Sequence, residues 1–483
     1  MPRGKRKTVD EAGRMGKKSK SGLYSGRGNG ATSSAASAID NGSTDDKPKE
    51  ERMKIRLEGS KTSGDLLFCG GTNWDLIGRA SLPKAAAGVK PQGGRNLWGP
   101  HHITSIGKIR IRSVISGPTA CHSIIITEDG KAMSWGRNDR EQLGHGDNVR
   151  RDNPTLIESL KEHNIVSAAC GRNHTLCLTE YGTVFAFGDN RYGQLGIGLQ
   201  SASVGNPVKV GHKGQPIVKV ACGADFSMIL DCKGSLHSFG HPEYSQLGHN
   251  NDGQYFVTSN KLSFDCQLVP RKIQMFVEKN KGHVMPVPNV LLTDVACGTN
   301  HVIALDIRKR VFTWGFGGYG RLGHAEPKDE KVPRNLKTFD VTGRGASSIY
   351  CGASFSMAVS EQGILYFWGQ TKTTGEATMY PKPVQDLTGW KIRSVGCSNH
   401  SIVIAADDSV ISWGPSPTYG ELGYGDHGAK SSTQPKEIKL LDGINIHSVA
   451  CGYGHTLMIA RNDSDEDTNS INKLPEFSVK AEN

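Results

Sequence analysis

A short phrase recurs seven times along this chain, and this internal repetition limits the possible folds more than any other feature. The fullest copies read V-x-x-x-x-G-x-x-H-[ST], as in VSAACGRNHT (166–175). A second phrase begins with an acidic residue and a turn and ends in an aromatic residue and glycine. Six copies end at Gly136, Gly188, Gly240, Gly315, Gly369 and Gly414. A third phrase, [QRE]-Leu-Gly, appears in five units, and the basic period is near 52 residues.

Each unit has the composition of short antiparallel strands. Runs rich in Val, Ile, Thr and aromatic residues alternate with Asp-Gly or Gly-rich turns, and glycine makes up 60 of the 483 residues. One unit supplies about four strands, which are too few to bury both faces of a sheet, so neighbouring units have to stack. The sequence therefore predicts an all-β chain folded as a β-propeller.

The ends of the repeat region predict how the ring closes. The seventh copy of the first phrase starts at Val449, but the chain turns polar and acidic after Ala460 without the second phrase. The missing phrase stands near the N-terminus as DLLFCGG (65–71). We therefore expect N-terminal strands to complete the last of seven blades, which leaves the ring without a free edge and the protein monomeric. The predicted parts are a disordered basic tail (1–62), the propeller (63–461) and a disordered acidic tail (462–483).

The charge of the chain is concentrated in its first tail. The net charge is +11; residues 1–30 hold nine bases against two acids, whereas residues 463–483 hold six acids against two lysines. A flexible basic segment can bind nucleic acid or the acidic microtubule surface through counterion release, and short basic runs also act in nuclear import. A merely solvating tail is the alternative. The bases assigned to binding or import are Arg3, Lys5, Arg6, Lys7, Lys17, Lys18 and Lys20.

Other features disfavour several classes of protein. No apolar run approaches the roughly 18 residues that span a bilayer and no hydrophobic signal segment is visible, so a soluble intracellular protein is expected. The 11 cysteines include no Cys-x-x-Cys pair, so we expect reduced thiols and neither a zinc site nor any other metal or cofactor. No nucleophile elbow, Walker-type loop or kinase phrase occurs, which disfavours an ordinary catalytic enzyme and predicts no catalytic residues.

Residues that recur once in each unit are interpreted as scaffold. The histidines of one repeat position are expected to hydrogen-bond buried loop backbone; they are His122, His174, His301, His400 and His455, with Phe226 and Phe355 in their place in two copies. The cysteines before the repeat glycine are expected to be small buried strand residues; they are Cys170, Cys222, Cys297, Cys351, Cys397 and Cys451. The aromatic residues of the second phrase are expected to wedge between blades; they are Trp135, Phe187, Phe239, Trp314, Trp368 and Trp413.

The order of strands in a meander assigns the loops to two faces. The loops after the first and third strands of a blade emerge at one end, and the Asp-Gly turns and inter-blade connections emerge at the other. The first end gathers arginine and aromatic residues, which are enriched in protein interfaces, so we predict that it binds a protein partner; solvated loops are the alternative. Its predicted members are Asn73, Trp74, Arg137, Asn138, Arg140, Arg172, Arg191, Tyr319, Arg321 and Tyr419.

An insertion of about 25 residues lengthens one unit, over about 250–289. Loops of this length without a repeat role are often functional. We expect the insertion on the opposite face, where its bases suit an acidic partner. These bases are Arg271, Lys272, Lys279 and Lys281.

The repeats CGRNHTLCLTEYGTVFAFGDNRYGQLGIG and FTWGFGGYGRLGHAE resemble those of the regulator of chromosome condensation family, whose fold is a seven-bladed propeller. The resemblance covers roughly residues 65–461. Four stretches outside the repeats are similar to one branch of that family: TNWDLIGR (72–79), NLWGPH (96–101), VPNV (287–290) and SWGPSPTYGELGYGDH (412–427).

The resemblance implies a function without covalent catalysis. The family's founding member is a guanine-nucleotide exchange factor for Ran that docks on nucleosomes. The similar branch is associated with centromeres, the central spindle and the chromosomal passenger complex, and with Rac-, Ral- and Arf-type GTPases. A regulator of such a GTPase, rather than of Ran, acting in mitosis and cell spreading is therefore implied, by exchange or by capture of the nucleotide-free form.

The same resemblance implies a location. It is the nucleus and nucleolus in interphase, the centromeres, spindle midzone and midbody in mitosis, and some cytoplasm. Two other functions remain open at this point. One is a non-catalytic chromosome or microtubule adaptor of the chromosomal passenger pathway. The other is a propeller hydrolase, which would need acids or a metal site in the central channel.

Overall fold

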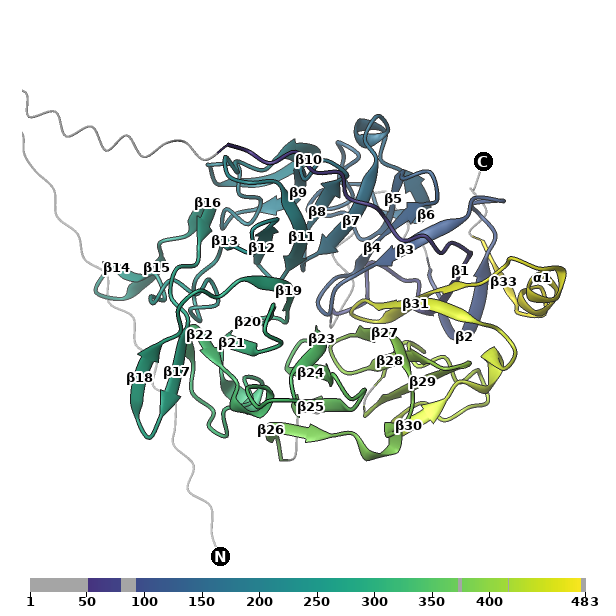
Figure 1. Ribbon diagram of the computed structural model, residues 1–483. Coiled ribbons are helices and arrows are strands. Elements are labelled where there is room, and N and C mark those ends of the chain that lie inside the picture. The colour runs from purple at the N-terminus through teal and green to yellow at the C-terminus, as the bar shows by residue number, and fades with distance from the viewer. Residues whose placement is uncertain (1–50, 80–92, 372–375, 416, 479–483) are drawn as a thin grey trace, which may run out of the picture. The chain divides into compact units, whose positions relative to one another are not determined.

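Seven antiparallel sheets surround a central axis in the computed structural model (Figure 1). The structure describes residues 51–79, 93–371, 376–415 and 417–478. The first four blades in chain order are blade 1, with β3 (Ile111–Ile115), β4 (His122–Thr127), β5 (Ala132–Gly136) and β6 (Arg151–Leu156); blade 2, with β7 (Ile165–Cys170), β8 (His174–Thr179), β9 (Val184–Asn190) and β10 (Ser201–Lys209); blade 3, with β11 (Ile217–Cys222), β12 (Phe226–Asp231), β13 (Leu236–Gly240) and β16 (Gln267–Lys272); and blade 4, with β19 (Leu292–Cys297), β20 (His301–Asp306), β21 (Val311–Gly315) and β22 (Glu330–Asn335).

Three further blades close the ring. They are blade 5, with β23 (Ala346–Cys351), β24 (Phe355–Ser360), β25 (Leu365–Gly369) and β26 (Thr378–Pro383); blade 6, with β27 (Ile392–Cys397), β28 (Ile402–Ala406), β29 (Ser409–Gly414) and β30 (Ser432–Glu437); and blade 7, with β31 (Ile446–Cys451), β32 (His455–Ala460), β1 (Asp65–Gly71) and β2 (Asn96–Ile103). Single-turn 3₁₀ helices are η1 (Glu158–Leu160), η2 (Gly318–Gly320), η3 (Lys337–Phe339), η4 (Gln385–Leu387) and η5 (Lys439–Leu441).

The second strand of each blade carries the core. Every residue of β8, HTLCLT, is buried, and the second strands of the other six blades are buried in the same way. A strand that packs against a neighbouring sheet on both faces needs apolar or hydrogen-bonded residues at every position. The fourth strands are less buried because they lie on the rim of the ring; β10, for example, has several exposed residues.

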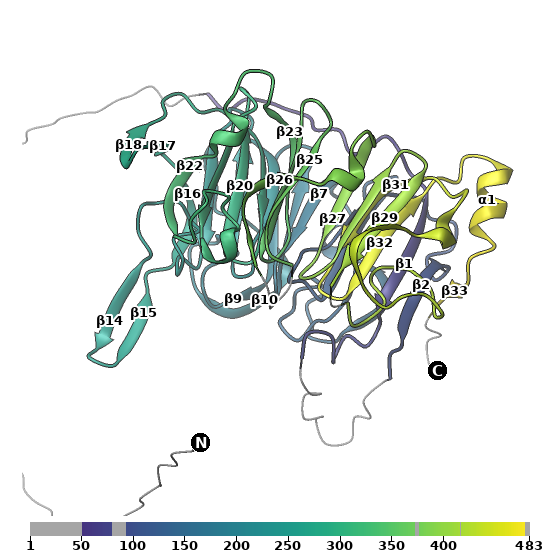
Figure 2. The ribbon, with the colours of Figure 1, turned by 90° about the horizontal axis from the view of Figure 1, so that it is seen from below.

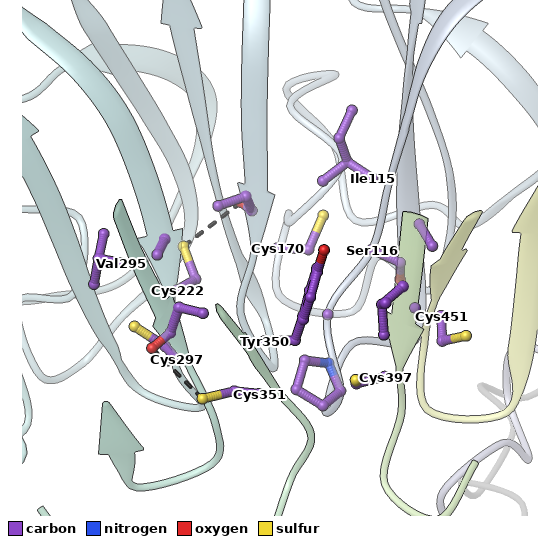
Figure 3. Close-up of a pocket in the computed structure, with 18 of the residues that line it drawn as sticks. Ile115, Ser116, Cys170, Cys222, Val295, Cys297, Tyr350, Cys351, Cys397 and Cys451 are labelled. Carbon is purple, nitrogen blue, oxygen red and sulfur yellow. Dashed lines mark hydrogen bonds between the residues drawn. The ribbon is translucent and has the colours of Figure 1, made fainter. Parts of the chain in front are cut away.

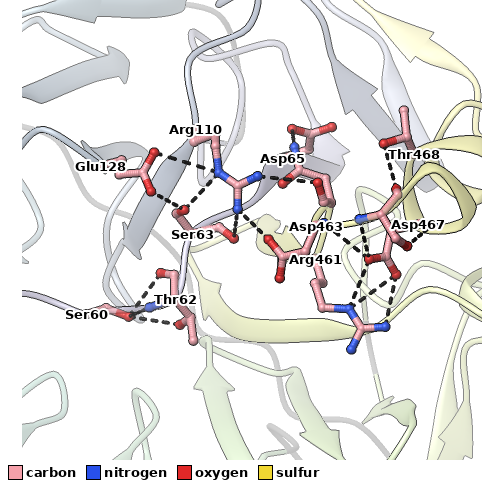
Figure 4. A network of polar contacts seen from close by, with 12 residues as sticks. Ser60, Thr62, Ser63, Asp65, Arg110, Glu128, Arg461, Asp463, Asp467 and Thr468 are labelled. Carbon is pink, nitrogen blue, oxygen red and sulfur yellow. Dashed lines mark hydrogen bonds and ion pairs between the residues drawn. The ribbon is translucent and has the colours of Figure 1, made fainter.

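Blade 7 joins the two ends of the chain, as the repeat pattern predicts. β1 pairs antiparallel with β32 over six residues, and β2 pairs with β1. The Arg110 guanidinium lies across this joint: it donates to the carbonyl of Ser63 at 3.0 Å and to the carboxylate of Asp463 at 2.7 Å (Figure 4). The seven-bladed propeller closed by N-terminal strands is confirmed.

The acidic C-terminal segment is more ordered than expected. Residues 465–471 form helix α1 (Asp465–Ile471), whose capping box joins Ser464 and Asp467. The chain then pairs as β33 (Glu476–Phe477) parallel to β2, which makes it a fifth strand of blade 7. The expected disorder therefore does not extend to 465–477, because this segment finds an open strand edge and a capped helix start.

The inserted segment is split between the two faces, which corrects its expected placement. The hairpin of β14 (Gln254–Thr258) and β15 (Lys261–Phe264) lies between the third and fourth strands of blade 3, so it emerges on the predicted partner face. The hairpin of β17 (Val277–Asn280) and β18 (His283–Pro286) follows the fourth strand and extends the sheet of blade 4 at its outer edge. Figure 2 shows the two hairpins leaving blades 3 and 4 on opposite sides.

The repeat histidines join neighbouring blades. His122 Nε2 lies 2.9 Å from Thr175 Oγ1 of the next blade, and His174 Nε2 lies 2.9 Å from Ser227 Oγ. His301 and His455 make the same contact with Ser356 and Ser123, at 2.9 and 2.7 Å. The partner is thus a side-chain hydroxyl of the next blade, whereas loop backbone was expected.

His400 does not belong to this set, contrary to expectation. Ser398 N donates to Ser401 O at 2.8 Å, as Gly171 N does to His174 O, so Ser401 occupies the histidine position of blade 6. His400 stands three residues after Cys397, whereas His174 stands four residues after Cys170, so His400 falls one residue before the repeat position. This also explains why Ser398 replaces the repeat glycine. A Cβ on Gly171 would lie 2.1 Å from the His174 ring, and Ser401 has no ring to avoid.

Candidate partner-binding face

The loops after the first and third strands meet at one end of the ring, as predicted. In blade 2, Asp189 N donates to Asn173 O at 2.8 Å, which ties the two loops together. The first loops are also joined from blade to blade, since Arg172 N donates to Ala224 O and Ala224 N to Thr299 O, both at 3.0 Å. These backbone bonds hold the loops of one face in fixed relative positions. We call this end the loop face and the other end the turn face.

Two arginines on the loop face are each held by a carboxylate, that of Asp189, which is buried, and that of Asp225, which is partly buried. Arg191 makes a two-pronged contact with Asp189, Nε to Oδ1 at 3.0 Å and Nη2 to Oδ2 at 2.6 Å, and Asp189 is fully buried. Arg172 lies 3.1 Å from Asp225. Burial raises the pKa of Asp225, and Arg172 opposes this shift. Both guanidinium groups are exposed yet oriented, which lowers the entropy lost when such a side chain binds a partner.

Aromatic side chains continue this surface across blades 3 and 4. Tyr244 packs on Phe316 with ring centroids 4.9 Å apart, and the Arg321 guanidinium lies 4.6 Å from the centroid of Phe316. Tyr319 is 53% exposed and also lies over Arg321. Burial lowers the pKa of Arg321 to about 10, so it remains charged at neutral pH. Arg321 supports the aromatic residues from below.

Three predicted members of the face are buried and cannot contact a partner directly. Trp74 is 2% exposed, in a cluster with Phe68 and His455. Asn138 is 1% exposed, and its amide donates to the carbonyls of Asp147 and Val149. Arg321, at 4%, donates to Ala353 O in the next blade. These three residues organise the loops. Residue type alone does not separate this structural role from a role in binding.

The predicted members in blades 6, 7 and 1 are used within the protein. Arg137 donates to the carbonyls of Trp74 (3.0 Å) and Ile77, and thereby clamps the loop after β1 onto blade 1. Asn73 accepts from Leu76 N in the same loop, Tyr419 accepts from Gly78 N, and Arg140 is half-buried. The exposed and oriented members, Arg172, Arg191 and Tyr319, come from blades 2 and 4.

The β14–β15 hairpin adds an apolar element that the sequence analysis placed elsewhere. Its exposed side chains are Tyr255 (49%), Phe256 (73%), Val257 (51%) and Leu262 (43%). The base of the hairpin is anchored on the loop face, because His241 packs on Phe264 with centroids 4.7 Å apart. In the sequence, the feature that pointed to this hairpin was the abnormal length of the insertion. Arg172, Arg191, Tyr319 and this hairpin together form the candidate site.

The predicted bases of the insertion do not form one cluster. Arg271 and Lys272 are exposed on β16, and Lys281 lies in the turn between β17 and β18. Lys279 is paired with Glu330, 2.7 Å from each carboxylate oxygen. The basic tail residues Arg3 to Lys20 lie outside the described residues.

The central channel is lined by small and sulfur-containing side chains (Figure 3). Its volume is about 350 Å³, and six repeat cysteines from Cys170 to Cys451 line it. Burial raises the pKa of Cys351 and Cys451 to about 12, so these thiols are protonated, and none of the eleven cysteines, all described, forms a disulfide. The carboxylate in the described lining, Asp294, is paired with Lys219.

Within the described residues, no three His, Cys, Asp or Glu side chains are placed to hold a metal ion. No helix in that part of the chain is long and apolar enough to cross a membrane.

Comparison with known proteins agrees with this geometry. The family model described as RCC1-like domain matches residues 65–458. Protein RCC2 of Homo sapiens is 58% identical over 434 residues, which is 90% of this chain and 83% of the relative. The Protein RCC2 homolog of Danio rerio is 58% identical over 430 residues, 89% of this chain and 87% of the relative. These matches confirm the branch that the non-repeated stretches indicated.

A solved structure shares the architecture. Prp20p from Saccharomyces cerevisiae superposes with a TM-score of 0.64 over 87% of this chain and 96% of its own, at 22% identity. That level of identity supports the fold.

Proposed function

The chain belongs to the RCC1-like domain family, and on this premise we propose that it regulates a small GTPase bound to its loop face. The observation that carries the proposal is the candidate site itself. Arg172 and Arg191 are exposed but fixed by Asp225 and Asp189. On the same face, Tyr319 of blade 4 and the β14–β15 hairpin of blade 3 present exposed aromatic side chains. Oriented arginine beside exposed aromatic side chains is the composition of binding hot spots.

The proposed action needs no covalent chemistry. A propeller that binds the nucleotide-free GTPase more tightly than the loaded forms shifts the population towards the empty state, and nucleotide leaves faster. If the complex is long-lived, the same preference captures the GTPase instead of recycling it. The proposed partner is of Rac, Ral or Arf type, as the similarity to the branch suggests. Prp20p, whose binding to Gsp1p and histones has been characterised, is a propeller of the same fold.

We further propose that the basic tail tethers the regulator to chromatin and microtubules in mitosis, alongside the chromosomal passenger complex. The nuclear and nucleolar location in interphase, the centromere, midzone and midbody location in mitosis, and a role in cell spreading belong to the same proposal. The nine bases of residues 1–30 support it. A non-catalytic adaptor is the second candidate, because this tail can bind polyanions without any contribution from the loop face.

The direct test is release of a fluorescent nucleotide from Rac, Ral, Arf and Ran. We compare the intact protein with the double variant Arg172→Gln/Arg191→Gln, which removes both charges and keeps polar groups beside Asp225 and Asp189. The control is Arg56→Gln/Arg344→Gln, two exposed arginines on the turn face. We expect acceleration on one GTPase, at least tenfold weaker in the loop-face variant and unchanged in the control.

Other outcomes separate the alternatives. Tight capture of a nucleotide-free GTPase without acceleration indicates a sequestering regulator. Neither acceleration nor capture on any of the four GTPases contradicts the proposal and leaves the adaptor. The tether is tested by deletion of residues 1–50 and sedimentation with nucleosomes or microtubules between about 50 and 200 mM salt. Equal binding by both proteins at every salt concentration refutes the tether alone.

A further inference from the structure

The turns at the ends of the second strands form a ring on the turn face. In each blade, the residue after the second strand donates its N–H to the connection that enters the same blade, as Glu180 N does to Asn164 O at 3.0 Å. The seven residues at this position, from blade 1 to blade 7, are Glu128, Glu180, Cys232, Ile307, Glu361, Asp407 and Arg461. Four of them are acidic, and blade 4 alone places an aliphatic side chain there.

Blade 4 exposes a pair of aliphatic side chains at this place. Ile307 is 60% exposed, and Leu291, whose carbonyl accepts the Ile307 N–H at 2.9 Å, is 49% exposed. The acceptors in the other six blades are Arg110, Asn164, Pro216, Gly345, Lys391 and Asn445, none of them a large aliphatic residue. The exposed aliphatic pair is therefore specific to blade 4.

The third residue of this turn is a lysine in a conformation that favours glycine. Lys309 has a φ of 66°, and its N–H donates to Asp306 O at 3.0 Å. The residues that make the same bond in blades 1, 2, 3 and 5, with φ between 73° and 83°, are Gly130, Gly182, Gly234 and Gly363. A side chain in this conformation costs energy that glycine avoids, and such residues cluster at functional sites. Arg308 and Lys309 are both exposed and form no ion pair with any residue that the structure describes.

These residues form one surface with the connection to blade 5. Ala346 N donates to Lys309 O at 2.9 Å, and Val341 in that connection is 50% exposed. We define the turn patch by Leu291, Ile307, Arg308, Lys309 and Val341. The exposed residues that flank it are the bases Lys233 and Arg344 and the acids Asp340 and Glu361. The patch therefore combines three aliphatic side chains with an excess of positive charge, and adjoining exposed apolar side chains mark interaction surfaces.

Among the described residues, the segment before β1 stops short of the turn patch. Residues 52–64 are the dark purple segment that leads to β1 in Figure 1, and they follow the turns of three blades in succession. The contacts, from blade 1 to blade 3, are Ser63 Oγ to Glu128 at 2.9 Å, Arg56 Nε to Glu180 at 2.7 Å and Met53 Sδ to Cys232 Sγ at 3.8 Å. The turn patch begins where these contacts end.

The rest of the chain offers no matching cover for the patch. The residues that flank the three internal gaps in the described chain lie in connections after third strands, which belong to the loop face. Residues 25–50 contain one large apolar residue, Ile39, whereas the patch exposes three aliphatic side chains. Residues 1–30 are strongly basic, as the patch is. The occupant that matches the patch is therefore another molecule.

We propose that the turn patch docks an acidic amphipathic segment of a partner protein. The aliphatic residues of that segment pack on Leu291, Ile307 and Val341, and its carboxylates face Arg308 and Lys309. The three aliphatic side chains select a protein over a nucleic acid, whose phosphates need basic groups alone.

Other parts of the turn face repel such a segment. The turn of blade 1 carries Glu128 and Asp129, and that of blade 6 carries Asp407 and Asp408. Because like charges oppose association, docking is confined to the sector around blade 4. This sector lies on the face opposite the candidate site. The turn patch therefore does not depend on the proposed function, and the propeller can hold two partners at once.

The test uses a labelled peptide of about 14 residues, with leucine at every third or fourth position and glutamate at most others, which forms an acidic amphipathic helix. Its binding to the full-length protein is followed by fluorescence anisotropy. We expect saturable binding with a dissociation constant below about 0.5 mM. A peptide with serine in place of the leucines should bind at least tenfold more weakly, because burial of aliphatic side chains contributes about that factor or more.

A variant built from one of the chain's own turns locates the contact. Ile307→Glu/Arg308→Tyr/Lys309→Gly gives blade 4 the turn Glu-Tyr-Gly that blade 2 has at 180–182. We expect at least tenfold weaker peptide binding and a melting temperature that is not lowered, because glycine relieves the conformation of Lys309. Gln362→Tyr makes the same turn in blade 5 and is the matched control, which should bind as the unaltered protein does. Leu291→Ser tests the patch outside the turn and should also weaken binding.

Three results would overturn the proposal. They are no saturable binding up to about 1 mM, equal affinity for the leucine and serine peptides, and unchanged binding to the variant with the Glu-Tyr-Gly turn in blade 4. Weaker binding of a DNA duplex of about 20 base pairs to that variant, without any peptide binding, would assign the patch to nucleic acid instead.

Two further measurements separate this surface from other parts of the chain. At least tenfold tighter peptide binding after deletion of residues 1–50 would show that the chain's own N-terminal segment occupies the patch, and would also refute a partner protein as the occupant. Failure of nucleotide release with peptide binding retained would contradict the proposed function alone.

Discussion

Replacing Ser227 by Val should destabilise this propeller more than replacing Ser227 and His174 together. Ser227 Oγ donates its hydrogen to Gln194 O at 2.8 Å, so the contact of 2.9 Å with His174 Nε2 has the imidazole as donor. The ring is then neutral, and burial lowers the pKa of His174 to about 4. The equivalent positions between blades 3 and 4 are Phe226 and Val302, which pack together and are both fully buried. Neighbouring blades are therefore joined by one of two matched pairs of side chains: a histidine with a hydroxyl, or a phenylalanine with an aliphatic side chain.

The magnitudes follow from which groups lose a partner. Ser227→Val leaves the His174 N–H buried without an acceptor, at about 1–3 kcal/mol, and removes the donor to Gln194 O, at about 1 kcal/mol. Added apolar burial offsets about 1 kcal/mol. The net loss is about 1–3 kcal/mol. His174→Phe/Ser227→Val restores a matched pair and should recover about 1–2 kcal/mol of it. His174→Phe alone should stay within about 1 kcal/mol of the original, because Ser227 keeps its bond to Gln194 O.

The assay is urea denaturation of the four proteins, followed by tryptophan fluorescence and checked by refolding. With a slope of about 4 kcal/mol per molar urea for a chain of this size, a loss of 2 kcal/mol lowers the midpoint by about 0.5 M. The double-mutant cycle gives the coupling between the two positions. Additivity within about 0.5 kcal/mol, or a Ser227→Val protein as stable as the double variant, would refute the matched-pair explanation.

Three further predictions concern acid, ring closure and the C-terminal segment. Burial lowers the pKa of His122 and His455 to about 3 and of His174 to about 4; between pH 6.5 and 4 the unfolded chain therefore binds protons that the folded chain does not. The urea midpoint should fall steadily as pH drops through that window, and His174→Phe/Ser227→Val should reduce the slope; a flat profile contradicts the neutral buried rings. Deletion of residues 1–71 removes β1 and should lower the melting temperature by more than about 10 °C or cause aggregation. Deletion of residues 1–50, the control, should have neither effect. Equal melting temperatures of the two proteins would argue against closure of the ring by β1. Ser464→Ala breaks the capping box and should weaken α1 by about 1 kcal/mol, seen as faster hydrogen exchange in residues 465–477 with an unchanged global midpoint; unaltered exchange refutes the cap.

For the candidate site, the sequence predicted which face a residue lies on better than it predicted whether that residue is exposed. The prediction that the loops of Arg172 and Arg191 share a face depends only on alternation of strand direction, and it is confirmed by the bond from Asp189 N to Asn173 O. Trp74 and Asn138 belong to loops of the same face in blades 7 and 1 but are buried, because each fills or ties a loop interior. Arginine, tryptophan and asparagine serve both purposes, and only packing separates them. The roles of the exposed residues in binding stay predictions.

The histidine position shows a similar limit. The phrase around His400 looks like the other copies, but its histidine stands three residues after the cysteine and not four, so Ser401 occupies the repeat position. The matched pairs across joints were also present in the sequence, as Ser227 or Val302 one unit after His174 or Phe226. They could be recognised only once the structure had shown which positions face each other.

The strand content, the number of blades and the closure of the ring by residues 65–71 follow from the amino-acid pattern alone, because they depend on local hairpin patterns repeated at a fixed period. Packing in three dimensions placed the β14–β15 hairpin on the loop face and paired residues 476–477 with β2. These features arise from contacts between segments far apart in the chain. Local periodicity carries no information about the register of such contacts, which is set by packing of particular side chains.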